Sequence, residues 1–167
     1  MTQMVMEFLV PETDWSPPTS FPDLTNQKEI AIDLETCDPW LRSHGPGWAC
    51  KDRGYIIGII NGEIHDTMMA APLLNENEYS YSLNSLGKMY LDEVKDETML
   101  TEAAQIFGVD PKSEMYKLAP KYVGVYAEQD ADLTYRLWQI LKKGISEDNI
   151  TEIYNLERSL LPVLIDM

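Results

Sequence analysis

Two acidic motifs that lie far apart in the chain constrain its fold more than any other feature. The first, Asp33-Leu34-Glu35, follows the apolar run Ile30-Ala31-Ile32, and the second, Tyr126 to Asp130, opens a long amphipathic segment. A short apolar run predicts a buried β-strand, whereas apolar residues at helical spacing predict an α-helix. The chain is therefore expected to fold as an α/β domain whose carboxylates lie at the end of a strand and on a helix.

Apolar spacing and turn residues predict the remaining elements. Strands are expected over Ile30–Leu34, Tyr55–Ile60 and, briefly, Glu63–His65. Helices are expected over Thr67–Leu74 (with Pro72 weakening its second half), Ser82–Tyr90, Glu97–Phe107 (ended by Gly108), Val123–Lys143 (closed by Gly144) and Glu147–Met167. The last segment is strongly apolar, which predicts that its helix packs against a neighbour.

The charge balance limits the classes of partner. The 167 residues include 28 acidic and 13 basic side chains, for a net charge of −15. This balance argues against a chain that grips long duplex DNA alone, because such proteins usually carry an excess of Lys and Arg. No apolar run approaches the length of about eighteen residues that spans a membrane, so no membrane association is expected.

The acidic residues form a pattern suited to divalent cations. On a strand, Asp33 and Glu35 face the same side, and on a helix Tyr126 and Asp130 share a face. Carboxylate oxygens are the ligands that Mg²⁺ prefers, and two such ions roughly 3.5–4 Å apart can hydrolyse a phosphodiester. Lys112, Lys117 and Lys121 precede the helix and are candidate contacts for DNA phosphates, although solvated lysines are an equal alternative.

Most of the chain from residue 28 onward resembles the 3′–5′ proofreading exonuclease domain of family A DNA polymerases. The resemblance is to the DEDD type with a tyrosine in its last motif, and especially to phage polymerases. The matching stretches are IAIDLET, GPGWA, YIIGI, IHDTMMAAPLL, YSLNSLGKMYL, DPKSEMYKLAPKYVGVYAEQDADLTYRLWQIL and LERSLLPVLIDM.

This resemblance implies a ribonuclease-H-like fold and two-metal removal of 3′-terminal nucleotides from single-stranded DNA. It carries over Asp33, Glu35 and Asp130 as ligands of Mg²⁺ or Mn²⁺, and Tyr126 as the residue that orients the attacking water. It also implies a cytoplasmic location in a bacterial host. The implied domains are an exonuclease-like domain over residues 28–146 and, over 147–167, the start of a linker helix toward an absent polymerase domain or chain. Residues 1–27, in which prolines alternate with aromatic residues, are expected to form an irregular arm that packs through its aromatic residues.

One family motif is missing from the sequence. The family carries a further ligand in a motif of the type Asn-x-x-Tyr/Phe-Asp, and no such motif occurs between Asn61 and Tyr126. Compared with a domain of usual size, this chain is expected to lack on the order of seventy residues. The expected fold is thus a reduced mixed sheet of about three strands, flanked by helices, with the Asp33 strand in its centre. Asp66 is the nearest carboxylate that could substitute for the missing ligand.

The missing ligand leaves alternatives open. The leading hypothesis is a proofreading exonuclease domain whose activity is weak or absent because its site is incomplete. The second is a non-catalytic structural or interaction module that docks onto a polymerase part through the C-terminal helix. The third is a shortened polypeptide with no function of its own.

Overall fold

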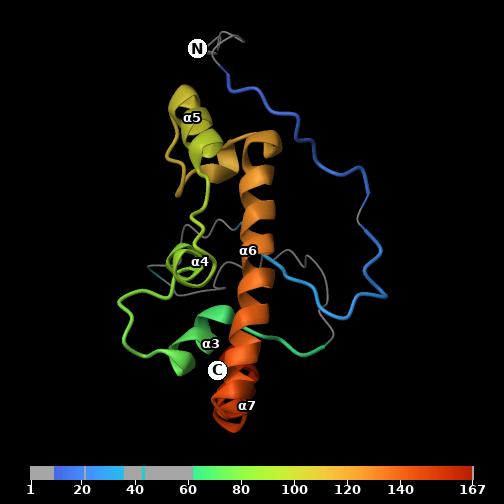
Figure 1. Cartoon of the computed structure of the whole chain (residues 1–167). Coiled ribbons are helices and arrows are strands. Elements are labelled where there is room, and N and C mark those ends of the chain that lie inside the picture. Colours follow the sequence, from blue (N-terminus) through green and yellow to red (C-terminus); the bar gives the residue numbers. More distant parts are fainter. Residues whose placement is uncertain (1–9, 21, 36–42, 44–61, 167) are drawn as a thin grey trace.

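The computed structural model describes residues 10–20, 22–35, 43 and 62–166. Its regular elements are α3 (Thr67–Leu74), α4 (Leu83–Leu91), α5 (Thr98–Phe107), the short 3-10 helix η2 (Met115–Lys117), α6 (Pro120–Glu147) and α7 (Thr151–Asp166). The helices α3, α4, α5 and α7 all contact α6, which runs through the middle of the molecule (Figure 1). The helical predictions are therefore confirmed, with differences at their ends.

Helix α6 is longer than predicted at both ends. Its 28 residues correspond to a rod of about 42 Å. It begins at Pro120, whose missing N–H costs nothing in the first helical turn. The prediction that Gly144 closes the helix was wrong. A Cβ on Gly144 would lie 3.0 Å from the Leu74 side chain, so this glycine lets α3 pack closely against α6.

The main hydrophobic core surrounds the C-terminal half of α6. Helices α3 and α4 cover this half and α7 returns along it. Helix α3 continues through Pro72 to Leu74, and Asp66 caps its start by accepting hydrogen bonds from the N–H groups of Met68 and Met69. Pro72 therefore does not end the helix. The buried members of this core are Ala70, Ala71, Leu86, Leu137, Trp138, Leu141, Ile145 and Tyr154.

A second, smaller core lies at the N-terminal end of α6. It joins Tyr122 of α6 to α5 and to Val10 of the N-terminal arm. Helix α5 ends at Gly108 as predicted, with a φ of 65° that glycine adopts without strain. The arm also places Trp15 against Gly124, which agrees with the expectation that the arm packs through its aromatic residues.

The predicted sheet is not observed in the part of the chain that the structure describes. Residues 30–35 form no strand, and Ile30 and Leu34 are 48% and 54% exposed, so the expectation of a buried strand there was wrong. A strand needs a hydrogen-bonded neighbour, and the expected one, Tyr55–Ile60, lies outside the described residues. Residues 63–65 also form no strand. Of the three predicted strands, only Tyr55–Ile60 stays a prediction.

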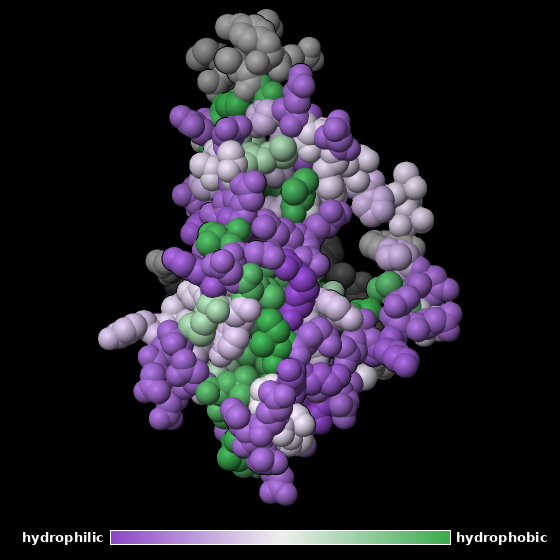
Figure 2. Space-filling model, in the orientation of Figure 1, coloured by the Kyte–Doolittle hydropathy of each residue, from purple (hydrophilic) through white to green (hydrophobic). Residues whose placement is uncertain are grey.

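The face of the molecule drawn in Figure 2 is mostly hydrophilic. Figure 2 shows hydrophobic groups gathered toward the end of the molecule where α3, α6 and α7 lie. On α7 the exposed hydrophobic side chains are Ile153, Leu156, Leu160 and Val163. Among the described helices, none is both long enough and apolar enough to cross a membrane.

Candidate metal centre

Helix α6 places a carboxylate inside the protein. Leu133 and Leu137 are fully buried, so the face of α6 that carries them is turned toward the interior. Asp130 precedes Leu133 by three residues and Leu137 by seven, a spacing that puts all three on that face. Asp130 is consequently only 5% exposed, and Tyr126, one turn earlier, is half-buried beside it.

The segment before residue 36 brings two more carboxylates to Asp130. One carboxylate oxygen each from Asp33, Glu35 and Asp130 lies within 4.8 Å of the other two. Figure 1 shows this light-blue segment reaching the middle of α6. The three acidic residues predicted as ligands therefore meet, although the segment that carries Asp33 and Glu35 is not a strand.

Burial and mutual repulsion act on the two acids of this segment. Burial is the main cause that raises the pKa of Asp33, and the charge of Asp130 raises it further. The pKa of Glu35 is raised by burial first and then by Asp33 and Asp130. Neighbouring carboxylates thus disfavour the ionised forms of Asp33 and Glu35, a condition that a bound cation reverses.

Lys95, which the sequence analysis did not single out, completes the cluster. Its Nζ lies 2.7 Å from Oδ2 of Asp130 and 2.8 Å from the hydroxyl oxygen of Tyr126. It also lies 4.5 Å from the centre of the Tyr126 ring. The Lys95 side chain is 10% exposed. In the sequence it is a single lysine within the acidic run from Asp92 to Glu97, where a solvated side chain is the ordinary expectation.

The neighbours of Lys95 and Tyr126 keep both side chains protonated. Desolvation, the largest influence, lowers the Lys95 pKa, but hydrogen bonds to Asp130 and Tyr126 outweigh it, so the pKa is raised overall. Burial is the main cause that raises the pKa of Tyr126, and the hydrogen bond from Lys95 only partly opposes it. At neutral pH the site therefore contains an ammonium group and a neutral phenol.

One polar atom of the cluster is suited to bind a divalent cation. Oδ1 of Asp130 is buried and has no hydrogen-bond partner among the described residues. A buried acceptor without a partner costs about 1–3 kcal/mol, so proteins seldom keep one without a use for it. An oxygen of this kind beside the carboxylates of Asp33 and Glu35 is the donor set that hard divalent cations prefer. The residues present therefore fit Mg²⁺ or Mn²⁺.

Asp66 does not join the three acids. It caps α3, with its Oδ1 2.8 Å from the backbone nitrogen of Met68. The adjacent His65 stacks on Trp138 at a centroid distance of 4.3 Å. Trp138 follows Asp130 by eight residues of α6, which at 1.5 Å per residue is on the order of 12 Å along the helix. The structure gives no support to Asp66 as a substitute ligand.

A cavity of about 360 Å³ adjoins the acidic cluster. Glu35 lines it together with Trp15, Lys112 and Tyr116. Trp15 is held in place by a hydrogen bond from its Nε1 to Glu128 at 2.8 Å. The cavity thus joins one carboxylate of the cluster to two aromatic rings and to one of the lysines proposed as DNA contacts.

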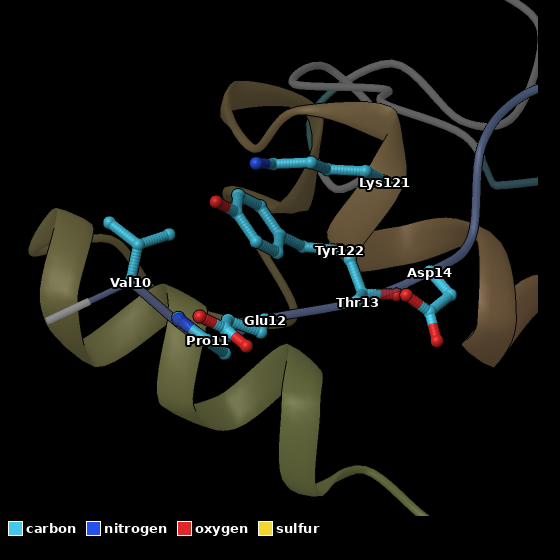
Figure 3. Close-up of a pocket in the computed structure, with 7 residues that line it drawn as sticks. All are labelled: Val10, Pro11, Glu12, Thr13, Asp14, Lys121 and Tyr122. Atoms are coloured by element: carbon cyan, nitrogen blue, oxygen red, sulfur yellow. The ribbon is translucent and has the colours of Figure 1, made fainter. Parts of the chain in front are cut away.

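The other two candidate DNA contacts occupy different surroundings. Lys117 pairs with Glu114. Lys121 lies 4.7 Å over the ring of Tyr122 and lines a second cavity of about 480 Å³ between the arm and the start of α6 (Figure 3). That cavity contains Glu12 and Asp14 and none of the three clustered acids. Of the three lysines, Lys112 is the one beside the candidate metal centre.

Comparison with known proteins places the chain in a family. Residues 48–146 match the 3′–5′ exonuclease family, which is more than half of the chain, and the chain therefore belongs to that family. The resemblance noted in the sequence is thereby confirmed. No solved structure gives a significant match.

The most similar relatives include DNA polymerases of phages. A DNA-directed DNA polymerase of Pseudomonas phage M6 is 28% identical over 221 residues, covering 94% of this chain and 33% of the relative. DNA polymerase DpoZ of Salmonella phage PMBT28 is 34% identical over 105 residues, covering 60% of this chain and 17% of the relative. DNA polymerase I of Rhizobium leguminosarum is 51% identical over 43 residues, 25% of this chain and 4% of the relative. The chain thus spans a third or less of the length of these relatives.

Proposed function

We propose that this chain is the 3′–5′ exonuclease domain of a phage-type DNA polymerase. Its reaction would be the metal-dependent hydrolysis of the 3′-terminal nucleotide from single-stranded DNA. The observation that carries the proposal is the meeting of oxygens from Asp33, Glu35 and Asp130 within 4.8 Å in a chain of the 3′–5′ exonuclease family.

Each side chain of the cluster has a distinct role in this proposal. Asp33, Glu35 and Asp130 hold Mg²⁺ or Mn²⁺. Such ions, when bound, activate water and offset the charge that develops on the phosphate. Tyr126 orients the attacking water by donating its hydroxyl proton to the water oxygen. An ammonium group can only donate hydrogen bonds. The hydroxyl oxygen of Tyr126 must therefore accept from Lys95, which leaves its own proton free to point at the water oxygen.

The cavity beside Glu35 is where we propose that the 3′ end of the DNA lies. Trp15 and Tyr116 line it, and aromatic rings stack on unpaired bases without regard to sequence. Lys112 lines the same cavity and is suited to contact a phosphate. The net charge of −15 weakens the binding of DNA by this chain alone. The domain would therefore depend on a polymerase part to present the DNA.

We further propose that hydrolysis by this chain is slow. The sequence contains no Asn-x-x-Tyr/Phe-Asp motif between Asn61 and Tyr126, and the family's two-metal chemistry uses a carboxylate from that motif. The alignment with the phage M6 polymerase supports a shortened domain, since it extends over 221 residues while including 94% of this 167-residue chain. The relative therefore has positions with no counterpart here.

The remaining parts of the chain fit a domain of a larger polymerase. We propose an N-terminal arm over residues 1–27, an exonuclease-like domain over 28–146, and the start of a linker helix over 147–167. Exposed apolar side chains on α7, among them Leu156 and Val163, support a docking role for that helix against a polymerase domain or chain.

The proposal is tested by release of nucleotides from a 3′-labelled single-stranded oligonucleotide in Mn²⁺ or Mg²⁺. We expect slow, metal-dependent release by the chain, and none by Asp33→Asn or Asp130→Asn. The matched control is Asp132→Asn, an exposed acid on α6 that pairs with Arg136 outside the cluster, and it should retain the activity. Failure of the unaltered chain to release any nucleotide in either metal would overturn the proposed activity.

A further inference from the structure

Lys95 is a charged residue whose side chain is only 10% exposed, and the metal ligands proposed above do not include it. We propose that its ammonium group is a built-in cation that takes the place of one metal ion, so that the site binds a single divalent ion. Asp33, Glu35 and Oδ1 of Asp130 would hold that ion, while Lys95 occupies Oδ2 of Asp130. This inference rests on the metal-binding part of the proposed function and not on nuclease activity.

The two oxygens of Asp130 are in different situations, and this difference supports the inference. Oδ2 lies 2.7 Å from Nζ of Lys95, within the range of a charge-assisted hydrogen bond. Oδ1 is buried without a partner among the described residues. Here one oxygen already has a cation and the other is still free to bind one.

The charges of the cluster balance with one divalent ion. Asp33, Glu35 and Asp130 carry three negative charges when ionised. One divalent ion and the Lys95 ammonium carry three positive charges, which neutralises the cluster. Two divalent ions with the ammonium would leave two positive charges in excess in a partly buried site, where unpaired charge is costly. The presence of Lys95 therefore favours a single ion.

Backbone hydrogen bonds to α4 and to α6 hold Lys95 in place. Its backbone nitrogen donates to Oδ1 of Asn84 in α4, at 3.2 Å. The next backbone nitrogen, of Asp96, donates to Oε1 of Gln129 in α6, at 3.0 Å. These bonds fix the connection between α4 and α5 against the helix that carries Asp130. The ammonium is thus a positioned part of the cluster and not the end of a mobile surface chain.

The position of Lys95 also gives it a role toward Tyr126. The same Nζ donates to the Tyr126 hydroxyl at 2.8 Å and lies over its ring. One ammonium therefore sets the orientation of both the candidate ligand and the candidate water-orienting residue. Lys95 is a positioning residue in this scheme, since it acts through Asp130 and Tyr126.

The test counts Mn²⁺ ions bound per chain, by isothermal titration and by electron paramagnetic resonance of the bound ion. We expect one ion in the unaltered chain, with no Mn–Mn spin coupling. Lys95→Met should bind two ions and show coupling, whereas Lys95→Arg, which keeps the positive charge, should bind one. Lys143→Met, which removes an exposed lysine on α6 that pairs with Glu147, is the matched control and should bind one.

Two ions in the unaltered chain would overturn the inference whatever the variants do, so the test does not depend on whether Lys95→Met folds. One ion in both the unaltered chain and a folded Lys95→Met, verified by circular dichroism, would also overturn it. Binding of one ion without release of nucleotides would contradict only the proposed activity. Absence of Mn²⁺ binding in every variant would contradict the metal site itself, and with it both proposals.

Discussion

Two clusters of polar and aromatic side chains lie along α6, and they differ in how completely their hydrogen bonds are made. Toward the C-terminal end, Nδ1 of His65 lies 2.7 Å from the hydroxyl of Tyr154, and the His65 ring stacks on Trp138. Nearer the middle of α6, the ion pair of Lys95 and Asp130 leaves Oδ1 of Asp130 without a partner among the described residues.

This difference separates a structural cluster from a candidate functional one. The His65 cluster belongs to the main core. Its polar atoms are hydrogen-bonded to each other, so they enter the core without leaving a buried polar atom unpaired. The Asp130 cluster keeps a buried acceptor unpaired and gathers like charges around it, which lowers stability in the absence of a cation. Features that lower stability concentrate at functional sites. The comparison therefore favours the Asp130 cluster as the candidate functional site.

Removing a core side chain near the first cluster should have the largest effect on folding. Leu137 is fully buried, and Leu137→Ala should lower the free energy of unfolding by about 2–5 kcal/mol, because it leaves a cavity. Urea denaturation measures this change. The variant should bind Mn²⁺ as the unaltered chain does while it stays folded. A loss of binding by the folded variant would show that the two clusters are not independent.

Breaking the ion pair of the second cluster should have effects on stability that are coupled between its two partners. In metal-free buffer, Lys95→Met and Asp130→Asn should each destabilise the fold, because each leaves its partner buried without compensation. Their double variant should be more stable than the sum of the single effects predicts, by about 0.5–3 kcal/mol. Urea denaturation of all four proteins gives this coupling energy. A coupling near zero would mean that the ion pair is not formed in solution.

The helices were predictable from sequence because each carries its own signals. Apolar spacing located α4, α5 and α6, and Gly108 marked the end of α5. The end of α6 was not predictable, because Gly144 is a local signal for a helix end that the helix passes through. Its actual use is to admit Leu74 of α3, which only the tertiary structure reveals. Likewise, the apolar character of residues 30–34 did not predict their exposure, since burial depends on what covers a segment.

The candidate site was predictable only where its chemistry follows a motif. Asp33, Glu35, Tyr126 and Asp130 were chosen from two motifs, and the structure brings the three acids together. Lys95 follows no motif, and its role depends on the fold of the connection between α4 and α5. Asp66 was proposed because it is near in sequence, but its carboxylate is already used to cap α3.

The histidine of the first cluster should make stability depend on pH. Burial is the main cause that lowers the pKa of His65, and Arg158 lowers it further. The unfolded chain, with an ordinary pKa of about 6.5, then binds a proton that the folded chain resists. Stability from this residue is present above pH 6.5 and is lost as the pH falls toward the lower folded pKa.

His65→Phe isolates this contribution, because it keeps a ring against Trp138 and removes the titrating group. The stability of the unaltered chain relative to His65→Phe should decrease as the pH is lowered from 7 toward 5 (pH values chosen around the ordinary histidine pKa). Thermal denaturation across this range measures the difference. A stability difference between the two proteins that does not change with pH would contradict the prediction.

Filling the space at Gly124 should have the smallest effect on stability. A Cβ at this position would collide with the ring of Trp15, so Gly124→Ala should move the arm away from α6. The helix itself gains from alanine by about 1 kcal/mol, which should offset the lost contact. Tryptophan fluorescence should report greater solvent exposure of Trp15, with little change in the urea midpoint. Trp15→Phe is the control that identifies the signal.

The assembly of the acidic cluster has a consequence for the order of folding. Helices α3 to α7 pack on α6 within one continuous stretch of chain, and contacts between nearby segments form early. Asp33 and Glu35 reach Asp130 only by closing a loop of about a hundred residues, which carries an additional entropic cost. We therefore expect the helical scaffold to form first and the three carboxylates to come together last, so that their mutual repulsion arises only once the scaffold is in place.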